Sequence, residues 1–283
     1  MTSARRAAVL VFLIIAWGIV PPLAAQDSAA RAPTTLPVLT PQEMEDFLLN
    51  ARIGATKGVN KGVTDARRVS LSDGRITHDA QVQDVDIFKP IFQLGKSSEV
   101  NFTDSYRYNI AAYRLAQLLG LDNVPMSVLR QVDGKPAAVT WWVDDVAMEE
   151  GQRQKKKLAG PNPERTAMNI YILRVFDELI QNRDRNAGNL LWTKDWTMWM
   201  IDHTRAFRLG RELQNPKLLD RCEASLLGRM RGLTAAAVAD AMGDILKQAE
   251  IDALMARRDL IVKQFDDRIA QRGEGAVLYT MPR

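Results

Sequence analysis

Cysteine and histidine are nearly absent from the 283-residue chain, which contains one cysteine and two histidines. Because Cys222 is alone, no intramolecular disulfide can form, and we expect its thiol to pack within a helix rather than to react. His78 and His203 belong to no histidine–cysteine cluster, which argues against a zinc site. The sequence also lacks a Gly-x-Ser-x-Gly elbow and a Walker-type phosphate loop. These absences disfavour a disulfide scaffold, a zinc enzyme, a serine hydrolase and a P-loop nucleotidase.

An excess of charge of one sign is also missing, since the formal net charge is only +4. Arg5 and Arg6 supply two of these charges and would leave with a signal peptide. This small net charge gives no reason to expect a nucleic-acid partner. The short basic run Lys155-Lys156-Lys157 could meet anionic lipid headgroups, but a solvated linker explains it more simply.

Long apolar runs are absent after residue 25. Before it, the basic Arg5-Arg6, the apolar run 7–20 and the small residues before position 26 have the three-part form of a secretory signal. The apolar run is shorter than the ~20 residues that a membrane span requires. We therefore expect residues 1–25 to be a signal peptide, with an uncleaved anchor or a buried helix as alternatives. The expected product is periplasmic or extracellular and has no stable membrane span after signal removal.

The first part of the chain alternates between strand and turn signals. Residues 26–39 form an expected flexible leader, and Thr40-Pro41-Gln42-Glu43 is typical of a capping box that starts a helix. Extended stretches are predicted around 68–71, within 76–88, and at 126–132 and 137–143, with turns at Asp73-Gly74 and Asp133-Gly134. Between them a helix is predicted from a cap at Thr103 or Asp104 to Leu119, and Gly120 would end it.

The second part is predominantly helical. After a break at 160–163, apolar residues recur at helical spacing over 164–181. A nearly apolar hairpin, 189–192 and 196–202, is expected to be buried on both faces, and helices are predicted over 216–230, 234–246 and 250–271. This order favours an α+β, two-lobed architecture. We predict a strand-rich lobe over 40–143, a linker over 144–163, a helical lobe over 164–271 and a tail over 272–283.

The polar loop between the long helix and the hairpin carries the chemistry. Asp184 and Asn189 are five residues apart, which is the spacing of a kinase catalytic loop, and Asp202 ends the returning strand of the hairpin. Phosphoryl transfer requires a carboxylate that orients the acceptor hydroxyl, together with oxygen ligands for magnesium or manganese. Each residue alone has a simpler reading as a turn, a surface ion pair or a helix cap. Their joint spacing around a buried hairpin favours the kinase interpretation.

Segments 184–191 and 199–207 resemble the catalytic and metal-binding segments of phosphatidylinositol 3-/4-kinase-like domains, of the secreted Golgi casein kinase group and of bacterial HipA-type kinases. Weaker similarity extends over roughly 54–210, including 62–64, Phe88-Lys89-Pro90, 108–113 and 121–125. The resemblance implies a protein-kinase-like fold with a small nucleotide-binding lobe, which would use ATP and either magnesium or manganese.

The resemblance assigns roles to individual residues. Asp184 matches the catalytic aspartate, while Asn189 and Asp202 match the metal ligands. Lys89 matches the lysine that steadies the nucleotide phosphates, with a plain surface lysine as the alternative. The remaining expected nucleotide-binding positions are Gly58 and Gly62 over the phosphates and Trp142 and Val143 at the hinge, although these tryptophans could simply be core residues.

Three positions depart from the family pattern. Asn109 replaces the helix glutamate that pairs with the lysine, unless Glu99 or Asp104 substitutes for it. Asn186 replaces a histidine, and His203-Thr204 replaces Phe-Gly. Two functions are therefore compatible with the sequence. One is an exported phosphotransferase acting on an unknown protein, lipid or small-molecule acceptor. The other is a kinase-fold pseudoenzyme that binds a nucleotide or a partner in the cell envelope.

Overall fold

A computed structural model describes residues 39–57, 66–95 and 97–281, all within the unit Val38–Arg283. The expected signal peptide, most of the leader, and Gly58 and Gly62 lie outside the described residues. Among the described residues, no helix combines the length and apolar character needed to cross a membrane.

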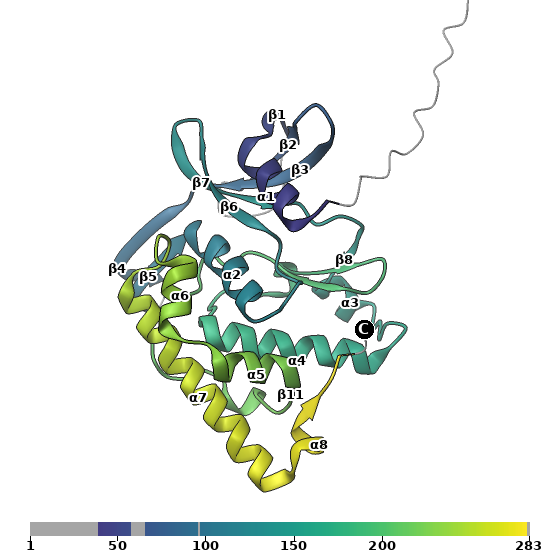
Figure 1. Ribbon diagram of the computed structural model, residues 1–283, viewed down its shortest axis with the longest axis vertical. Coiled ribbons are helices and arrows are strands. Elements are labelled where there is room, and N and C mark those ends of the chain that lie inside the picture. Colours follow the sequence, from purple (N-terminus) through teal and green to yellow (C-terminus); the bar gives the residue numbers. More distant parts are fainter. Residues whose placement is uncertain (1–38, 58–65, 96, 282–283) are drawn as a thin grey trace, which may run out of the picture. The chain divides into compact units, whose positions relative to one another are not determined.

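Five strands form an antiparallel sheet in the order β1-β2-β3-β7-β6, and the helices α1 and α2 pack against it (Figure 1). Thr40 and Glu43 form the predicted capping box of α1. Alternate strand residues such as Leu71, Val82 and Val139 are fully buried in the core of this lobe. The bounds are α1 Pro41–Asn50, β1 Arg52–Lys57, β2 Arg67–Ser72, β3 Thr77–Gln83, α2 Arg107–Leu118, β6 Ser127–Val132 and β7 Lys135–Trp141.

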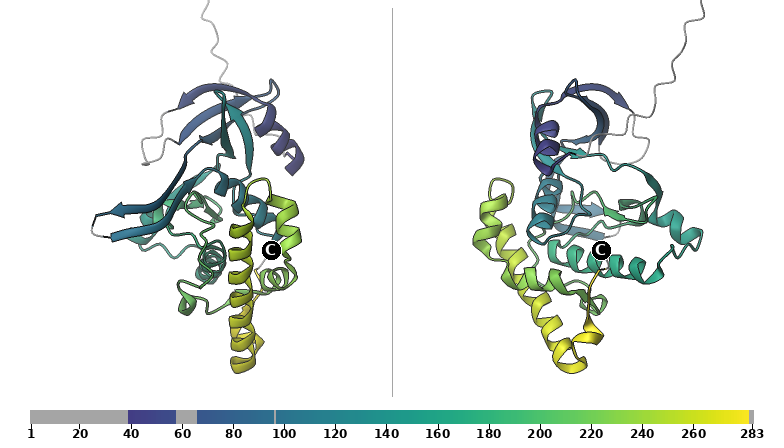
Figure 2. Two further views of the ribbon diagram at one scale, coloured as in Figure 1. Left: turned by 90° about the vertical axis from the view of Figure 1, so that its left-hand side faces the viewer. Right: turned by 45° about the vertical axis from the view of Figure 1, so that its right-hand side comes forward.

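Two further strands, β4 Asp86–Leu94 and β5 Ser97–Ser105, form a separate antiparallel ribbon that projects from the rest of the unit (Figure 2, left). Its apolar side chains Phe88, Ile91 and Val100 are all more than 60% exposed. Pairing of β5 with β4 continues through Ser105, so the chain becomes helical only at Arg107, with Tyr106 as the N-cap. The predicted cap at Thr103 or Asp104 is therefore wrong, because these residues belong to the strand.

The second lobe is built around the long helix α4, as predicted, with α7 packed against it (Figure 1). A three-stranded sheet, β10-β9-β8, contains the predicted hairpin. Its third strand, β8, and the helix α3 fall within the stretch predicted as a linker, and the short strand β12 pairs with β11. The bounds are β8 Val146–Glu149, α3 Glu150–Lys155, α4 Pro163–Ile180, β9 Leu190–Thr193, β10 Met198–Met200, β11 Cys222–Glu223, α5 Ala224–Gly232, α6 Ala235–Met242, α7 Gln248–Arg272, α8 Glu274–Val277 and β12 Leu278–Tyr279, with single 3-10 turns η1 Ala187–Asn189 and η2 Pro216–Leu218.

The helix predicted over 216–230 is interrupted. Asp220 accepts hydrogen bonds from Arg268 and Arg272 of α7, and the next residues pair in parallel with β12, so α5 begins only at Ala224 with Glu223 as its cap. Cys222 is buried in this short strand rather than in a helix. Burial raises the pKa of its thiol to about 12, which makes it unreactive, as expected from the sequence.

Helix α2 belongs to the larger core of the second lobe although it also packs on β6 and β7. Its buried residues Ile110, Ala111 and Leu115 lie in one cluster with Phe176 of α4 and Phe207. A shift of α2 would therefore disturb the sheet and the segment after Asp202 together.

Candidate active site

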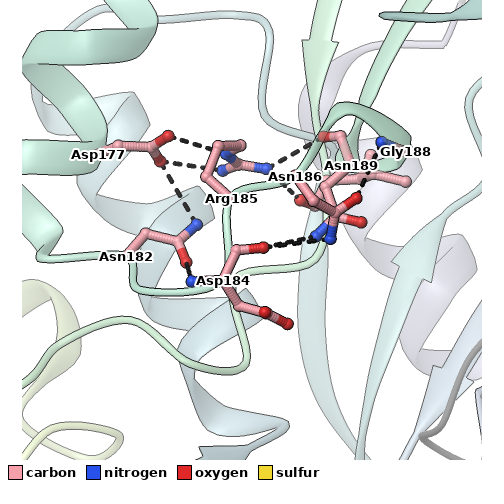
Figure 3. Close-up of polar contacts among 8 residues, drawn as sticks. Asp177, Asn182, Asp184, Arg185, Asn186, Gly188 and Asn189 are labelled. Carbon is pink, nitrogen blue, oxygen red and sulfur yellow. Dashed lines mark hydrogen bonds and ion pairs between the residues drawn. The ribbon is translucent and has the colours of Figure 1, made fainter. Parts of the chain in front are cut away.

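Arg185 organises the loop that connects α4 to β9. Its guanidinium donates to both carboxylate oxygens of Asp177, at 2.8 and 3.0 Å, and to the backbone carbonyls of Asn189, at 3.0 Å, and Ile201, at 2.7 Å (Figure 3). One largely buried side chain thus joins α4, the turn η1 and the end of β10. The loop begins where Gln181 adopts a left-handed backbone, φ 50°, which ends α4.

The backbone of Asp184 is held on both sides while its carboxylate remains accessible. Its N–H donates to Asn182 Oδ1 at 3.1 Å, and its carbonyl accepts from Asn186 and Asn189 at 3.2 and 3.3 Å. The side chain is 51% exposed and points away from these contacts (Figure 3). Arg205 Nη1 lies 3.8 Å from Asp184 Oδ1. A carboxylate presented in this way can accept a proton from a bound hydroxyl.

Asp202 lies two residues after the end of β10 and has a left-handed backbone, φ 54°. Burial raises the pKa of its carboxyl, and the negative charge of Asp184 raises it further, while the Thr204 hydroxyl, which donates to Oδ1 at 3.1 Å, opposes the shift. Burial likewise raises the pKa of Asp104, with a further contribution from Asp202. Three neighbouring carboxyl groups therefore repel one another and gain from a nearby cation.

A divalent metal ion fits this donor set. Asp202 supplies a carboxylate and Asn189 an amide oxygen, which accepts no hydrogen bond in the described part of the chain. Hard cations such as magnesium and manganese prefer such oxygen ligands. No group of three or more histidine, cysteine, aspartate or glutamate side chains in the described ranges could hold a metal by itself. The remaining coordination positions would therefore fall to phosphate oxygens or water.

The other predicted nucleotide-binding residues lie on different elements. Lys89 is exposed on the β4–β5 ribbon, where its ammonium lies 4.8 Å from the ring centre of Phe92. Trp142 follows β7, and the Arg68 guanidinium stacks on its ring at 4.3 Å. Val143 is buried and lines a cavity of about 600 Å³ whose walls include none of Asp184, Asn189 and Asp202. The roles of Lys89, Trp142 and Val143 therefore stay predictions.

Asn109, which replaces the helix glutamate expected from the resemblance, joins three elements through its side-chain amide. Its Nδ2 donates to Gln83 Oε1 of β3 at 2.7 Å, and its Oδ1 accepts from the His203 backbone N–H at 2.8 Å. All three residues are buried. The contact between sheet and helix is thus a neutral pair of amides, and α2 is tied to the segment after Asp202. The Gln83 partner carries no sequence signal that predicts it.

Replacement of this amide is expected to destabilise the protein. Asn109→Leu keeps a similar volume but removes two buried hydrogen bonds, the one to Gln83 Oε1 and the one from the His203 N–H. We expect the free energy of unfolding to fall by about 3 kcal/mol in urea denaturation. Asn50→Leu, at the exposed end of α1, is the matched control and should change it little. Equal stabilities of the two variants would contradict the bridging role.

Neither substitute proposed for the missing glutamate pairs with Lys89. Glu99 accepts from Arg205 and Arg208, at 2.5 Å each, and Asp104 lies beside Asp202. The two arginines were not singled out in the sequence, although both lie in or next to the recognised segment 199–207. Their partner is more than a hundred residues away, so spacing alone could not identify it.

No protein-family profile and no curated protein matches the chain by sequence. Among solved structures, it is similar to a hydra Fam20 protein with sugar, with a TM-score of 0.65 and 14% identity over 84% of this chain and 92% of that one. It is also similar to the Golgi casein kinase with Mn/ADP bound, with a TM-score of 0.59 and 13% identity over 84% and 78% of the two chains. A third is the Helicobacter pylori proinflammatory kinase CtkA, with a TM-score of 0.54 and 12% identity over 81% and 97%.

The chain has an atypical kinase fold. The structural likeness and the α+β, two-lobed arrangement confirm the fold predicted from the loop and hairpin motifs. At these identities the likeness concerns the fold. In this atypical kinase fold, Asp184, Asn189 and Asp202 lie on the loop and hairpin between α4 and the segment 203–210.

Proposed function

We propose that the chain is an exported kinase-like phosphotransferase that moves the γ-phosphate of ATP to an acceptor hydroxyl with the help of magnesium or manganese. The observation that carries this proposal is the half-exposed carboxylate of Asp184 close to the largely buried carboxylate of Asp202. The two charges repel each other and lie next to Asn189 in an atypical kinase fold. The apolar segment 7–20 with its basic start supports export to the periplasm or the exterior.

The proposed reaction assigns one task to each residue. Asp184 orients the acceptor hydroxyl and takes its proton as the bond from the acceptor oxygen to the γ-phosphorus forms. The bond from the γ-phosphorus to the oxygen bridging to the β-phosphate breaks, and its electron pair leaves on ADP. Asn189 and Asp202 would hold the metal ion, which neutralises charge on the phosphates when bound. Arg185 keeps these residues in position through its four hydrogen bonds.

The direct test is transfer of labelled γ-phosphate by the mature protein with manganese or magnesium. The acceptor panel should contain protein, sugar, lipid and small-molecule hydroxyls, since the similar structures include both a casein kinase and a protein with sugar. We expect metal-dependent nucleotide binding and label on at least one acceptor. Absence of nucleotide binding with either metal would contradict the proposal.

A kinase-fold pseudoenzyme is the second candidate, and a specific observation favours it. An uncharged asparagine, Asn109, stands at the helix position and bonds Gln83 of β3, and Lys89 is exposed on the ribbon. Nucleotide binding without turnover across the whole panel would support a binding role in the cell envelope.

A further inference from the structure

A kinase-like site requires a cation on the phosphates, and two familiar sources are changed in this chain. The helix position expected to carry a glutamate holds Asn109, whose Nδ2 donates to Gln83 Oε1 of β3 at 2.7 Å. Lys89 lies on the projecting ribbon with its ammonium against Phe92. Arg185 lies beside the catalytic loop, but its guanidinium is already occupied by four oxygen acceptors.

Unlike Lys89 and Arg185, Arg205 has a guanidinium that lies near Asp184 and is only partly engaged by other groups. It follows Asp202 by three residues, and its side chain is 18% exposed. Its Nη2 donates to Glu99 Oε2 at 2.5 Å, and the guanidinium stacks on Phe102 at 4.7 Å from the ring centre. Its Nη1 lies 3.8 Å from Asp184 Oδ1, beyond hydrogen-bond distance. One side of the guanidinium is thus anchored, and the other faces the catalytic carboxylate.

Glu99, which anchors Arg205, is itself held in place. Glu99 Oε1 accepts from Arg208 Nη2 at 2.5 Å, and Arg208 Nη1 donates to the Thr103 carbonyl at 3.2 Å. The side chains of Glu99 and Arg208 are 14% and 6% exposed. The two arginines share the Glu99 carboxylate, and the remaining guanidinium donors of Arg205 face Asp184 across 3.8 Å. A phosphate oxygen is the anion for which a preorganised guanidinium is best suited.

We propose that Arg205, oriented by Glu99, holds the γ-phosphate of the nucleotide. The pair of Arg205, from the segment after Asp202, and Glu99, from β5, then replaces the usual lysine–glutamate pair. The inference rests on the proposed function. A group 3.8 Å from the carboxylate that orients the acceptor hydroxyl is within reach of the phosphoryl group being transferred. Nη1 then donates to a phosphate oxygen, while Glu99 and Phe102 keep the guanidinium in place.

The test compares the affinities of ATP, ADP and AMP for the mature protein in the presence of manganese. Arg205→Ala should weaken ATP binding about tenfold or more, remove most of the preference for ATP over ADP, and leave AMP binding unchanged. Glu99→Gln should cause a smaller loss of the same kind, because Arg205 is still present but less firmly held. Lys89→Ala tests the lysine role expected from the resemblance, and Arg231→Ala, at an exposed arginine of α5, should retain wild-type affinities.

The outcomes separate this inference from the proposed function. If the wild type binds no nucleotide with manganese or magnesium, the proposed function fails, and this inference fails with it. If the wild type binds ATP and Arg205→Ala keeps its affinity and its preference over ADP, only the inference is overturned. A loss seen in Lys89→Ala instead would also overturn it. Arg208 still pairs with Glu99 in Arg205→Ala, and thermal unfolding of each variant checks that it is folded.

Discussion

Asp184→Asn is expected to lower the rate of phosphoryl transfer by about 10³-fold, within the 10²- to 10⁴-fold range of acid–base catalysis. Asparagine has nearly the same shape, and the hydrogen bonds of the Asp184 backbone to Asn182, Asn186 and Asn189 do not involve the changed group. The loop should therefore keep its conformation while it loses the group that accepts the proton. Nucleotide affinity in manganese should stay within a few-fold of the wild type.

Asp133→Asn is a suitable control for this measurement. Asp133 is an exposed aspartate in the turn between β6 and β7, outside the candidate site, and its left-handed backbone, φ 52°, suits asparagine as well. Its rate should equal that of the wild type. A wild-type rate for Asp184→Asn, in single-turnover assays with an identified acceptor, would remove Asp184 from the proposed mechanism.

Asp202→Asn is expected to affect binding and stability in opposite directions. Manganese-dependent nucleotide affinity should fall about 100-fold or more, because Asp202 is the charged one of the two proposed metal ligands. The metal-free protein should become more stable, with a melting temperature higher by about 2 °C, since a desolvated and repelled charge is removed. Calorimetric titration and thermal unfolding measure the two effects on one preparation.

The effect of Asp202→Asn on stability should change with pH in a definite direction. The pKa of Asp202 is raised by burial, so the folded protein binds this proton more tightly than the unfolded chain does. The contribution of Asp202 to stability therefore decreases as pH rises through the folded-state pKa. The stabilising effect of Asp202→Asn should be present at neutral pH and disappear in acid, below the ordinary pKa of an aspartate.

Asp133→Asn is again the matched control, because both positions have a left-handed backbone that asparagine tolerates. It should change neither the affinity nor the melting temperature at neutral pH. Undiminished metal-dependent binding by Asp202→Asn would contradict its assignment as a metal ligand. A destabilised Asp202→Asn protein would instead show that the carboxylate has a structural role in the segment 202–204.

The two variants together distinguish the proposed enzyme from the pseudoenzyme. An enzyme loses turnover in Asp184→Asn but binding in Asp202→Asn. A nucleotide-binding pseudoenzyme shows only the second loss, because no transfer depends on Asp184. The neutral pair of Gln83 and Asn109 does not by itself decide between them, since Arg205 offers another cation next to the carboxylate of Asp184.

Local sequence determined most of the elements and the loop and hairpin on which the predicted site residues lie. Apolar residues at helical spacing predicted α4, and Gly120 ends α2 with φ 66°, as its lack of a side chain allows. The Asp133-Gly134 turn joins β6 and β7 with positive φ at both residues. The spacing of Asp184, Asn189 and Asp202 indicated the kinase-like fold, because a short loop and hairpin bring these residues together without distant contacts.

Only the tertiary structure decided which partners these residues have. Glu99 meets Arg205 and Arg208 across more than a hundred residues, and Gln83 meets Asn109 across 26. Strand pairing also overrode local signals where β5 displaced the expected helix cap and β11 interrupted the helix predicted over 216–230. Periodicity and capping are local properties of the chain, whereas ion pairs and strand partners depend on which distant segments the folded core brings together.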